Sequence, residues 1–321
     1  MMEIIVKMLE FNHLALRRKS WECSFSGTFE PRKFYALCGE SGSGKSTLFS
    51  LLTGLTHPHA GQLTLDTRDI LGLPPHRRSM SLMTQHNSLF PGVSCEGNLR
   101  LAWQGSASGF SAKVGEILDL LRLDRELLAR NPNDLSGGQL ARMNLARALI
   151  TEARWLLLDE PFAAVDRPTR LSILAGLRDW QSRSNLCIVL IAHDLDDIFP
   201  VASDIIVCED GRITEQSPLT SAMTRPRRVA TARTLKNGLI IKKAGRHFFV
   251  PANQLKTPHT PDSTIADRSG YHQLERFIQY QHGDVTRVFD FDSQSEFNLI
   301  RSGSFSGRVQ FNQESLVELT S

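Results

Sequence analysis

The feature that most constrains this chain is a glycine-rich segment near its N-terminal end. The segment Gly-Glu-Ser-Gly-Ser-Gly-Lys-Ser-Thr starts at Gly39 and matches the pattern G-x-x-x-x-G-K-[ST]. The apolar stretch Phe34 to Cys38 before it predicts a buried strand, and Leu48 to Leu52 after it predicts a helix that ends at Gly54. Strand, loop and helix in this order predict an α/β domain built around a phosphate-binding loop.

Each residue type in this loop has a chemical reason. Glycines let the backbone curl so that successive N–H groups point at phosphate oxygens, and the helix N-terminus adds partial positive charge. Lys45 would neutralise the β- and γ-phosphates of ATP, and the Ser46 hydroxyl would bind Mg²⁺. A plain Gly/Ser-rich turn is the alternative, but it would not need the lysine, the hydroxyl and both flanking elements. The residues predicted to contact the nucleotide are Gly39, Glu40, Ser41, Gly42, Ser43, Gly44, Lys45, Ser46 and Thr47.

A second candidate site follows an apolar stretch later in the chain. Trp155 to Leu158 predicts a buried strand, and it ends in Asp159 and Glu160. A buried parallel strand would deliver both carboxylates to the carboxyl edge of the sheet, where ligands bind in such folds. We predict that Asp159 holds Mg²⁺ and that Glu160 polarises the attacking water and accepts its proton. The alternative is a strand end followed by a polar turn.

A third motif resembles a known family. Leu135-Ser136-Gly137-Gly138-Gln139 and the helix-forming stretch after it are similar to the signature sequence and helix of ATP-binding cassette (ABC) proteins. A serine and two glycines at a helix N-terminus offer a hydroxyl and free N–H groups to a second anion. The resemblance implies that Ser136, Gly137, Gly138 and Gln139 complete the nucleotide pocket of a second copy, in a head-to-tail dimer that holds two ATP molecules. The alternative is a plain turn followed by a helix N-cap.

Three single residues fall where the same resemblance expects them. Gln85 matches the glutamine loop, whose amide reaches Mg²⁺ and the attacking water and whose backbone faces the permease. Asp166 matches the aspartate loop that crosses the dimer interface, and His193 matches the switch histidine at the γ-phosphate. A lone Gln, Asp or His is ordinarily a surface or core residue. The assignment therefore rests on all three residues lying at the positions that the resemblance expects. The catalytic residues implied are Glu160, His193 and Gln85, with Ser46, Gln85 and Asp159 at the metal.

The resemblance covers roughly residues 3–215 and implies a transport ATPase. Phe90-Pro91 and the short helical stretch after Asn98 are most similar to importer cassettes, including those for molybdate, ferric iron and thiamine. Such a subunit docks on separate transmembrane permease subunits at the cytoplasmic face of the membrane, and it works indirectly with an external solute-binding protein. The permease and that binding protein select the solute, so the sequence leaves the solute open.

The adenine contact departs from the family pattern. Relatives place an aromatic residue near the end of the first strand, but the neighbourhood of Leu16 to Arg18 has none. Trp21 is the nearest aromatic, and Arg18 could stack through its guanidinium plane instead. Trp21 could equally belong to the core. The aspartate loop also departs, with Ala163-Ala164-Val165 before Asp166, but it keeps the aspartate.

Length predicts two domains, because 321 residues exceed the size at which one core usually stops growing. We predict an ATPase domain over residues 1–220, with a helical subdomain at about 94–147. A basic linker over 221–236 and a small β-rich, barrel-like domain over 237–321 follow. The strands expected there include a hairpin of Leu239–Lys243 with Arg246–Val250, and later segments at 284–291, 296–301 and 308–311.

The remaining composition bears on compartment and partners. No apolar run approaches the roughly 20 residues that a membrane helix needs, and the N-terminus carries no secretory signal, so the cytoplasm is expected. Five scattered cysteines without a Cys-x-x-Cys pair predict buried reduced thiols. A net charge of +3 is too small to indicate nucleic acid. The basic stretch Arg225 to Arg246 favours a solvated linker over contact with acidic lipids.

Two rival functions stay open. The first is a soluble ABC ATPase that acts on nucleic acid or ribosomes; the short stretch between Lys45 and Ser136 leaves no room for a long coiled coil, and the chain has one cassette. The second is a regulatory binding protein that has lost catalysis. The presence of Lys45, Gln85 and Glu160 speaks against it.

Overall fold

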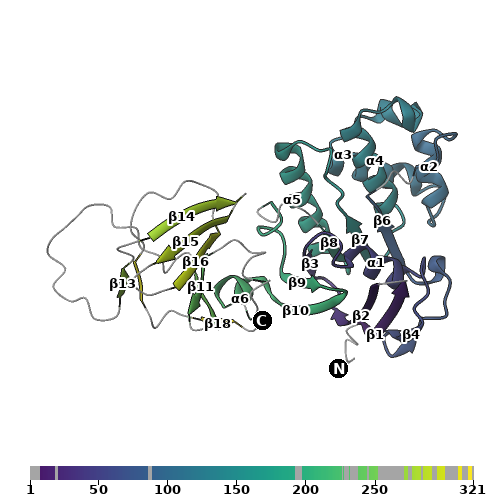
Figure 1. The fold of residues 1–321 in the computed structure, drawn as a ribbon. Coiled ribbons are helices and arrows are strands. Elements are labelled where there is room, and N and C mark those ends of the chain that lie inside the picture. Colours follow the sequence, from purple (N-terminus) through teal and green to yellow (C-terminus); the bar gives the residue numbers. More distant parts are fainter. Residues whose placement is uncertain are drawn as a thin grey trace, which may run out of the picture. The chain divides into compact units, whose positions relative to one another are not determined.

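The computed structural model describes residues 8–18, 21–85, 89–191, 197–225, 227 and 231, and then the strands at 238–243, 246–251, 271–273, 277–282, 285–290, 295–300, 310–312 and 317–319. The chain separates into two compact units, Met1–Gln216 and Ser217–Ser321. Figure 1 shows the helices and strands of both units.

The first unit is built on a six-stranded sheet with the order β10-β9-β3-β8-β7-β6. Its pairs from β9 through β3, β8 and β7 to β6 are all parallel. Every residue of β3, β7 and β8 is buried, which is typical of parallel strands covered on both faces. The predicted strands at 34–38 and 155–158 are confirmed as β3 and β7, and β7 extends to Asp159. The strands are β3 (Phe34–Cys38), β6 (Met80–Met83), β7 (Trp155–Asp159), β8 (Cys187–Ile191), β9 (Asp204–Glu209) and β10 (Arg212–Pro218).

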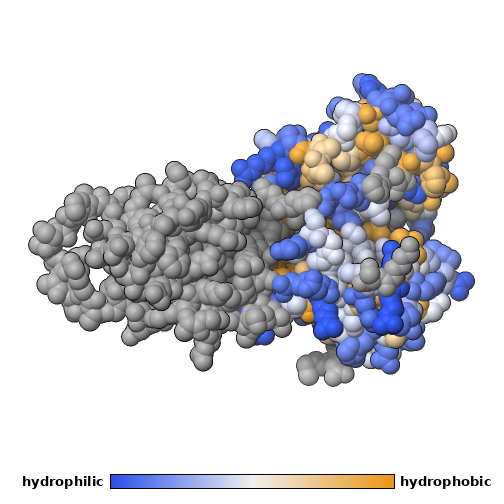
Figure 2. Space-filling model, viewed as in Figure 1, coloured by the Kyte–Doolittle hydropathy of each residue, from blue (hydrophilic) through white to orange (hydrophobic). Residues whose placement is uncertain are grey.

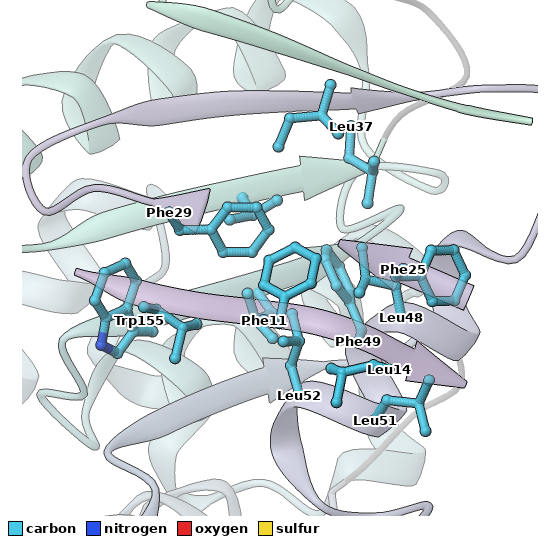
Figure 3. Packing of buried hydrophobic residues seen from close by; sticks show 14 of the residues in the cluster. Phe11, Leu14, Phe25, Phe29, Leu37, Leu48, Phe49, Leu51, Leu52 and Trp155 are labelled. Atoms are coloured by element: carbon cyan, nitrogen blue, oxygen red, sulfur yellow. The ribbon is translucent and has the colours of Figure 1, made fainter. Parts of the chain in front are cut away.

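A second sheet covers one side of this core. It has the order β2-β1-β4-β5, and its strands are β1 (Leu9–Arg18), β2 (Trp21–Phe29), β4 (Ala60–Leu65) and β5 (Arg68–Asp69). Its buried side chains pack with the helix α1 (Lys45–Thr53) and with the parallel sheet in one hydrophobic cluster. Figure 3 shows Leu48 and Phe49 of α1 beside Phe11 and Phe25. Burial of each such side chain contributes about 1.5–3 kcal/mol. The helix that begins at Lys45 is therefore stabilised by contacts with both sheets.

The remaining helices of this unit gather mainly in a lobe beside the sheet (Figure 1). The lobe contains α2 (Cys95–Ala102), α3 (Phe110–Leu121) and α4 (Gly137–Leu149), with short 3-10 turns at Arg125–Ala129 and Pro132–Asp134. A further 3-10 turn is Pro75–Arg77, and α5 (Arg167–Arg183) contacts α3. Ser94 begins α2 as an N-cap that accepts a hydrogen bond from Gly97 N. Figure 2 shows hydrophobic residues on the surface of the lobe. Among the described residues, no helix is long and apolar enough to cross a membrane.

The second unit contains α6 (Leu219–Thr224) and β-strands. Six strands form a sheet in the order β14-β15-β16-β11-β12-β18, and β13 pairs with β17. The predicted hairpin is confirmed, because β11 and β12 pair antiparallel. The structure also has β13, β14 and β18, which the sequence pattern did not single out. The strands are β11 (Gly238–Lys243), β12 (Arg246–Pro251), β13 (Tyr271–Gln273), β14 (Phe277–His282), β15 (Val285–Asp290), β16 (Ser295–Ile300), β17 (Gln310–Asn312) and β18 (Val317–Leu319).

Candidate functional site

The glycine-rich loop joins the end of β3 to the start of α1. Gly39, Gly42 and Gly44 have positive φ angles of 145°, 83° and 101°, which other residues rarely adopt. A Cβ atom at Gly39 would lie 2.1 Å from the carbonyl oxygen of Cys208, so only glycine fits there. The N-cap of α1 is Gly44, which has no side chain to cap the first-turn amides. The loop therefore has the backbone shape that suits an anion at a helix N-terminus.

Lys45 lies over this loop. Its Nζ atom donates hydrogen bonds to Gly39 O at 2.9 Å and to Glu40 O at 2.8 Å, and it lies 3.4 Å from the Ser43 hydroxyl. The ammonium group is thus held at the centre of the loop by the loop's own oxygens. Ser46 and Thr47 follow on the first turn of α1, and Ser46 is exposed. A positive charge in this position can neutralise a phosphate that the loop amides bind.

The two acidic residues lie at the carboxyl end of β7. Asp159 ends the strand and is only 7% exposed. Glu160 follows with a φ of 50°, and its N–H donates to Ile191 O at the end of β8. A positive φ is uncommon for glutamate and costs roughly 1–2 kcal/mol, and residues held in such conformations cluster at functional sites.

Gln85 meets Glu160 in the folded chain. Gln85 Nε2 donates a hydrogen bond to Glu160 Oε2 at 3.0 Å, although the two residues are 75 positions apart. Gln85 follows β6, which is the strand next to β7, so parallel pairing brings their carboxyl ends together. A neutral amide donor on a carboxylate orients that carboxylate without removing its charge. His193, the residue predicted to contact the γ-phosphate, lies outside the described residues.

The signature residues lie at the N-terminus of α4. Ser136 and Gln139 form a capping box, in which the Ser136 hydroxyl accepts from Gln139 N at 3.3 Å and Gln139 Oε1 accepts from Ser136 N at 3.0 Å. Ser136 and Gly137 are exposed. The helix N-cap that the sequence left as the alternative is therefore present, as a capping box whose ordinary sequence signal is the spacing Ser-x-x-Gln.

The aspartate loop lies beside the signature residues. A Cβ atom on Gly138 would lie 3.0 Å from the carbonyl oxygen of Ala164. Asp166 is exposed and begins α5, where its carboxylate accepts a hydrogen bond from Thr169 N at 2.9 Å. The Thr169 backbone N–H, and then its hydroxyl, lower the pKa of Asp166. Asp166, which was predicted only at a dimer interface, therefore also caps α5 within its own chain.

Trp21 is one of the two candidates for the adenine contact. Its side chain is partly buried and packs against the hydrophobic cluster. Its ring also lies against the phosphate loop, because a Cβ atom on Gly44 would be 3.1 Å from Trp21 Cζ2. Arg18 ends β1 and is exposed. Trp21 therefore packs against the core and also lies beside the phosphate loop.

The five cysteines are free and buried, as the sequence analysis predicted. Burial raises the pKa of the Cys38 thiol to about 12 and that of Cys208 to about 11, so both stay protonated at neutral pH. A separate cavity of about 240 Å³ lies between α3, α4 and α5, next to Lys113 and Trp180. None of the candidate site residues lines it.

A comparison with known families matches residues 24–163 to the ABC transporter family. This range contains the phosphate loop, Gln85, the signature residues, Asp159 and Glu160.

Curated relatives are import proteins. The chain is 32% identical over 210 residues to the Fe(3+) ions import ATP-binding protein FbpC of Yersinia pestis, covering 64% of this chain and 60% of that protein. It is 33% identical over 222 residues to the molybdenum import ATP-binding protein ModC of Rhizobium etli, covering 66% and 62%. It is 34% identical over 239 residues to the sulfate/thiosulfate import ATP-binding protein CysA of Mycobacterium bovis, covering 73% and 66%. The match thus spans about three fifths of the length of these relatives.

Solved structures share the fold. A dimeric bacterial ABC transporter cassette matches with a TM-score of 0.59 at 23% identity, over 66% of this chain and 98% of the cassette. A bacterial Atm1-family ABC exporter with ATP bound matches with a TM-score of 0.60 at 24% identity, over 68% of this chain and 40% of the exporter.

Proposed function

We propose that this chain, which belongs to the ABC transporter family, hydrolyses ATP to drive import across the cytoplasmic membrane. The match of residues 24–163 and the similarity to importer proteins support this proposal. One observation carries this proposal. The phosphate loop after β3 and the acids Asp159 and Glu160 after β7 lie at the same carboxyl edge of one parallel sheet, with only β8 between them. That edge is where α/β sheets bind ligands.

The reaction is ATP plus water to ADP and phosphate. The loop amides and Lys45 hold the β- and γ-phosphates, which places the terminal phosphate toward β7. Glu160 accepts the proton of the attacking water through its carboxylate, which the Gln85 amide orients at 3.0 Å. His193 contacts the γ-phosphate. Closing the site around these groups excludes water other than the nucleophile.

Mg²⁺ is the metal that the donor set fits. Ser46, Gln85 and Asp159 offer a hydroxyl, an amide and a carboxylate, which are the hard oxygen donors that Mg²⁺ prefers. The buried Asp159 at the strand end is suited to hold a cation or its bound water. When bound, the ion would neutralise negative charge on the phosphates.

We further propose that two copies of the chain bind ATP between them. Ser136, Gly137 and Asp166 are exposed, and the α4 N-terminus adds partial positive charge at the surface. The residues that would reach the ATP of the partner copy are Ser136, Gly137, Gly138, Gln139 and Asp166. Two bound ATP molecules would close this dimer, and hydrolysis would release it.

The partners proposed are transmembrane permease subunits, with an external solute-binding protein acting indirectly and no nucleic acid. The permeases would dock beside Gln85 on the helical lobe. Phe90 and Leu101, which are 48% and 64% exposed, lie in this region, because Phe90 N donates to Asn98 of α2 and Leu101 belongs to α2. Exposed apolar side chains favour a protein interface.

The solute proposed is a small oxyanion, a metal ion or a vitamin. The relatives named for Fe(3+), molybdenum and sulfate/thiosulfate support this range without choosing within it. We also propose the domain limits of the sequence analysis, with an ATPase domain over 1–220, a linker over 221–236 and a small barrel-like accessory domain over 237–321. The strands from β11 to β18 support the β-rich character of that last part.

The first test is ATP hydrolysis by the purified chain with Mg²⁺. Lys45→Met should abolish phosphate release, whereas the control Lys113→Met, whose lysine pairs with Glu116 and Glu152 outside the site, should retain it. Equal activity in wild type and Lys45→Met would remove the phosphate loop from catalysis. Co-purification from native membranes then tests transport. Recovery of a permease pair supports import, whereas ribosomes or nucleic acid without a permease would favour the soluble ATPase alternative.

A further inference from the structure

The floor of the phosphate loop is made by a distant hairpin. The backbone carbonyl of Ser43 accepts two hydrogen bonds, from Gly211 N at 2.9 Å and from the Cys208 thiol at 3.1 Å. Cys208 belongs to β9, and Gly211 lies in the tight turn between β9 and β10. Ser43 is only 6% exposed, so its carbonyl needs partners inside the protein.

The same hairpin is fitted closely to its surroundings. Gly211 has a φ of 74°, and a Cβ atom there would lie 2.7 Å from Cys23 Cβ and 2.9 Å from Glu22 O. Gly211 O also accepts a hydrogen bond from Ser24 N of β2. Since a Cβ atom on Gly39 would meet Cys208 O, the loop contacts β9 at Gly39 as well as at Ser43. The turn therefore has little freedom to move independently of the loop.

These contacts have a consequence for the loop amides. In a planar trans peptide the C=O and N–H groups point in opposite directions. Two donors that hold the Ser43 carbonyl against the floor therefore turn the N–H of Gly44 away from the floor, toward the side where a phosphate would lie. They also keep the negative end of that peptide away from an anion.

We propose that Gly211 and Cys208 are positioning residues for the phosphate loop, which set the orientation of the Ser43–Gly44 peptide and thereby the affinity for ATP. This inference rests on the proposed ATP site. Both residues act through Ser43 and neither touches the reacting atoms. Burial keeps the Cys208 thiol protonated, since its pKa is raised to about 11, so the donor is present throughout the physiological range.

The test measures the Kd for ATP with Mg²⁺ by calorimetry on the full chain. Gly211→Ala should weaken ATP binding by about tenfold, because alanine disfavours positive φ and its methyl group would press on Cys23. Cys208→Ala removes the weak thiol donor and should weaken binding by about threefold. Cys208→Ser should restore the wild-type affinity, because a hydroxyl donates to the same carbonyl. In turnover assays the KM for ATP should rise in the weakened variants while kcat changes little.

Two matched controls separate positioning from general stability. Cys187→Ala removes another fully buried thiol, at the start of β8, and should lower the Tm without changing the Kd. Asp210→Gly changes the neighbouring turn residue, whose φ of 43° glycine adopts freely, and should leave the Kd unchanged.

The outcomes are separable. If the wild type binds ATP and Gly211→Ala and Cys208→Ala lower only the Tm, the hairpin is purely structural and the inference falls while the proposed function stands. Should Gly211→Ala fail to fold, the comparison of Cys208→Ala with Cys208→Ser decides: equal Kd values would overturn the inference. Absence of ATP binding by the folded wild type would instead refute the proposed function itself.

Discussion

At the scale of single residues, the candidate site depends on one unusual backbone conformation. Glu160 is held at a φ of 50° by the hydrogen bond from its N–H to Ile191 O, and Gln85 donates to its carboxylate. Ile191 ends β8 and Gln85 follows β6, and these two strands are the neighbours of β7 in the sheet. The sheet itself therefore stabilises the strained residue.

The substitution Glu160→Gln tests the role of this carboxylate. The glutamine keeps the size of the side chain and an oxygen that can accept from Gln85, but it cannot take a proton from water. We expect ATP binding to be retained and turnover to fall by about 100-fold or more, as measured by phosphate release. A rate close to that of the wild type would remove Glu160 from catalysis.

A matched control is available at Glu152. This glutamate also has a φ of 50°, but it lies after α4 and pairs with Lys113 on the surface at 2.9 Å. Glu152→Gln should therefore leave turnover unchanged. The pair of variants separates the loss of a carboxylate at the site from the loss of a glutamate with the same backbone conformation.

At the scale of elements, the helix that carries Lys45 is held at its far end by a buried arginine. Arg78 is 0% exposed, and its guanidinium donates to the carbonyl oxygens of Leu51, Leu52, Leu71 and Leu73. Two of these acceptors lie in the last turn of α1, where unsatisfied carbonyls and the helix dipole favour a cation. Burial lowers the pKa of Arg78.

Arg78→Met should destabilise the chain by about 3 kcal/mol, because it removes the guanidinium donor from these carbonyl oxygens, although Leu51 O keeps the Gly54 N–H. The measurement is the free energy of unfolding in urea. Arg77→Met changes the neighbouring exposed arginine and should have an effect within about 0.5 kcal/mol. Similar losses in the two variants would show that the guanidinium contacts contribute nothing specific.

The N-terminus of α5 gives a pH-dependent prediction. The pKa of Asp166 is lowered in the folded chain by its hydrogen bond from Thr169 N. A lowered folded-state pKa means that the ionised form stabilises the fold above the unfolded pKa of about 3.9, and that this contribution is lost as the pH falls below it. Between about pH 5 and about pH 3, which lie on either side of that pKa, the unfolding free energy of Asp166→Asn should therefore fall less than that of the wild type.

The control is Asp179→Asn, at an exposed position nearer the other end of α5. Urea unfolding of both variants and the wild type at several pH values would show the difference. If Asp166→Asn kept the full acid sensitivity of the wild type, its capping hydrogen bond would not contribute to stability in solution.

At the scale of the whole molecule, the proposed dimer places the signature residues of one copy at the ATP of the other. Ser136 and Gly137 are exposed, and the capping box fixes the start of α4 without a partner copy. The surface is therefore already shaped before two copies meet, which reduces the conformational cost of association.

Ser136→Arg, introduced together with Glu160→Gln, tests this arrangement. A large cation at the interface should prevent the ATP-dependent dimer, as measured by light scattering after size-exclusion chromatography, while ATP still binds to each copy. The control Asp119→Arg adds the same side chain at an exposed position of α3 and should dimerise normally. Dimers of unchanged stability in the Ser136→Arg chain would contradict the shared site.

The sequence alone determined the local elements of the site. The strands at 34–38 and 155–158, the helix after the loop and its end at Gly54 have the predicted positions in the structure. These predictions succeeded because glycine spacing, apolar periodicity and helix caps act between residues that are close in sequence. In the second unit the hairpin was predictable for the same reason, whereas β14 lacked a clear apolar alternation, with glutamine and tyrosine between its ends.

Only the tertiary structure decided how distant residues meet. Gln85 reaches Glu160 across 75 positions, and Cys208 reaches Ser43 across 165. Neither hydrogen bond follows from the spacing of the residues, because both depend on which strands are neighbours in the sheet, and a buried apolar strand has the same composition wherever it lies. The sequence therefore specified the chemical groups and their local backbone, while the order of the strands decided which of those groups act together.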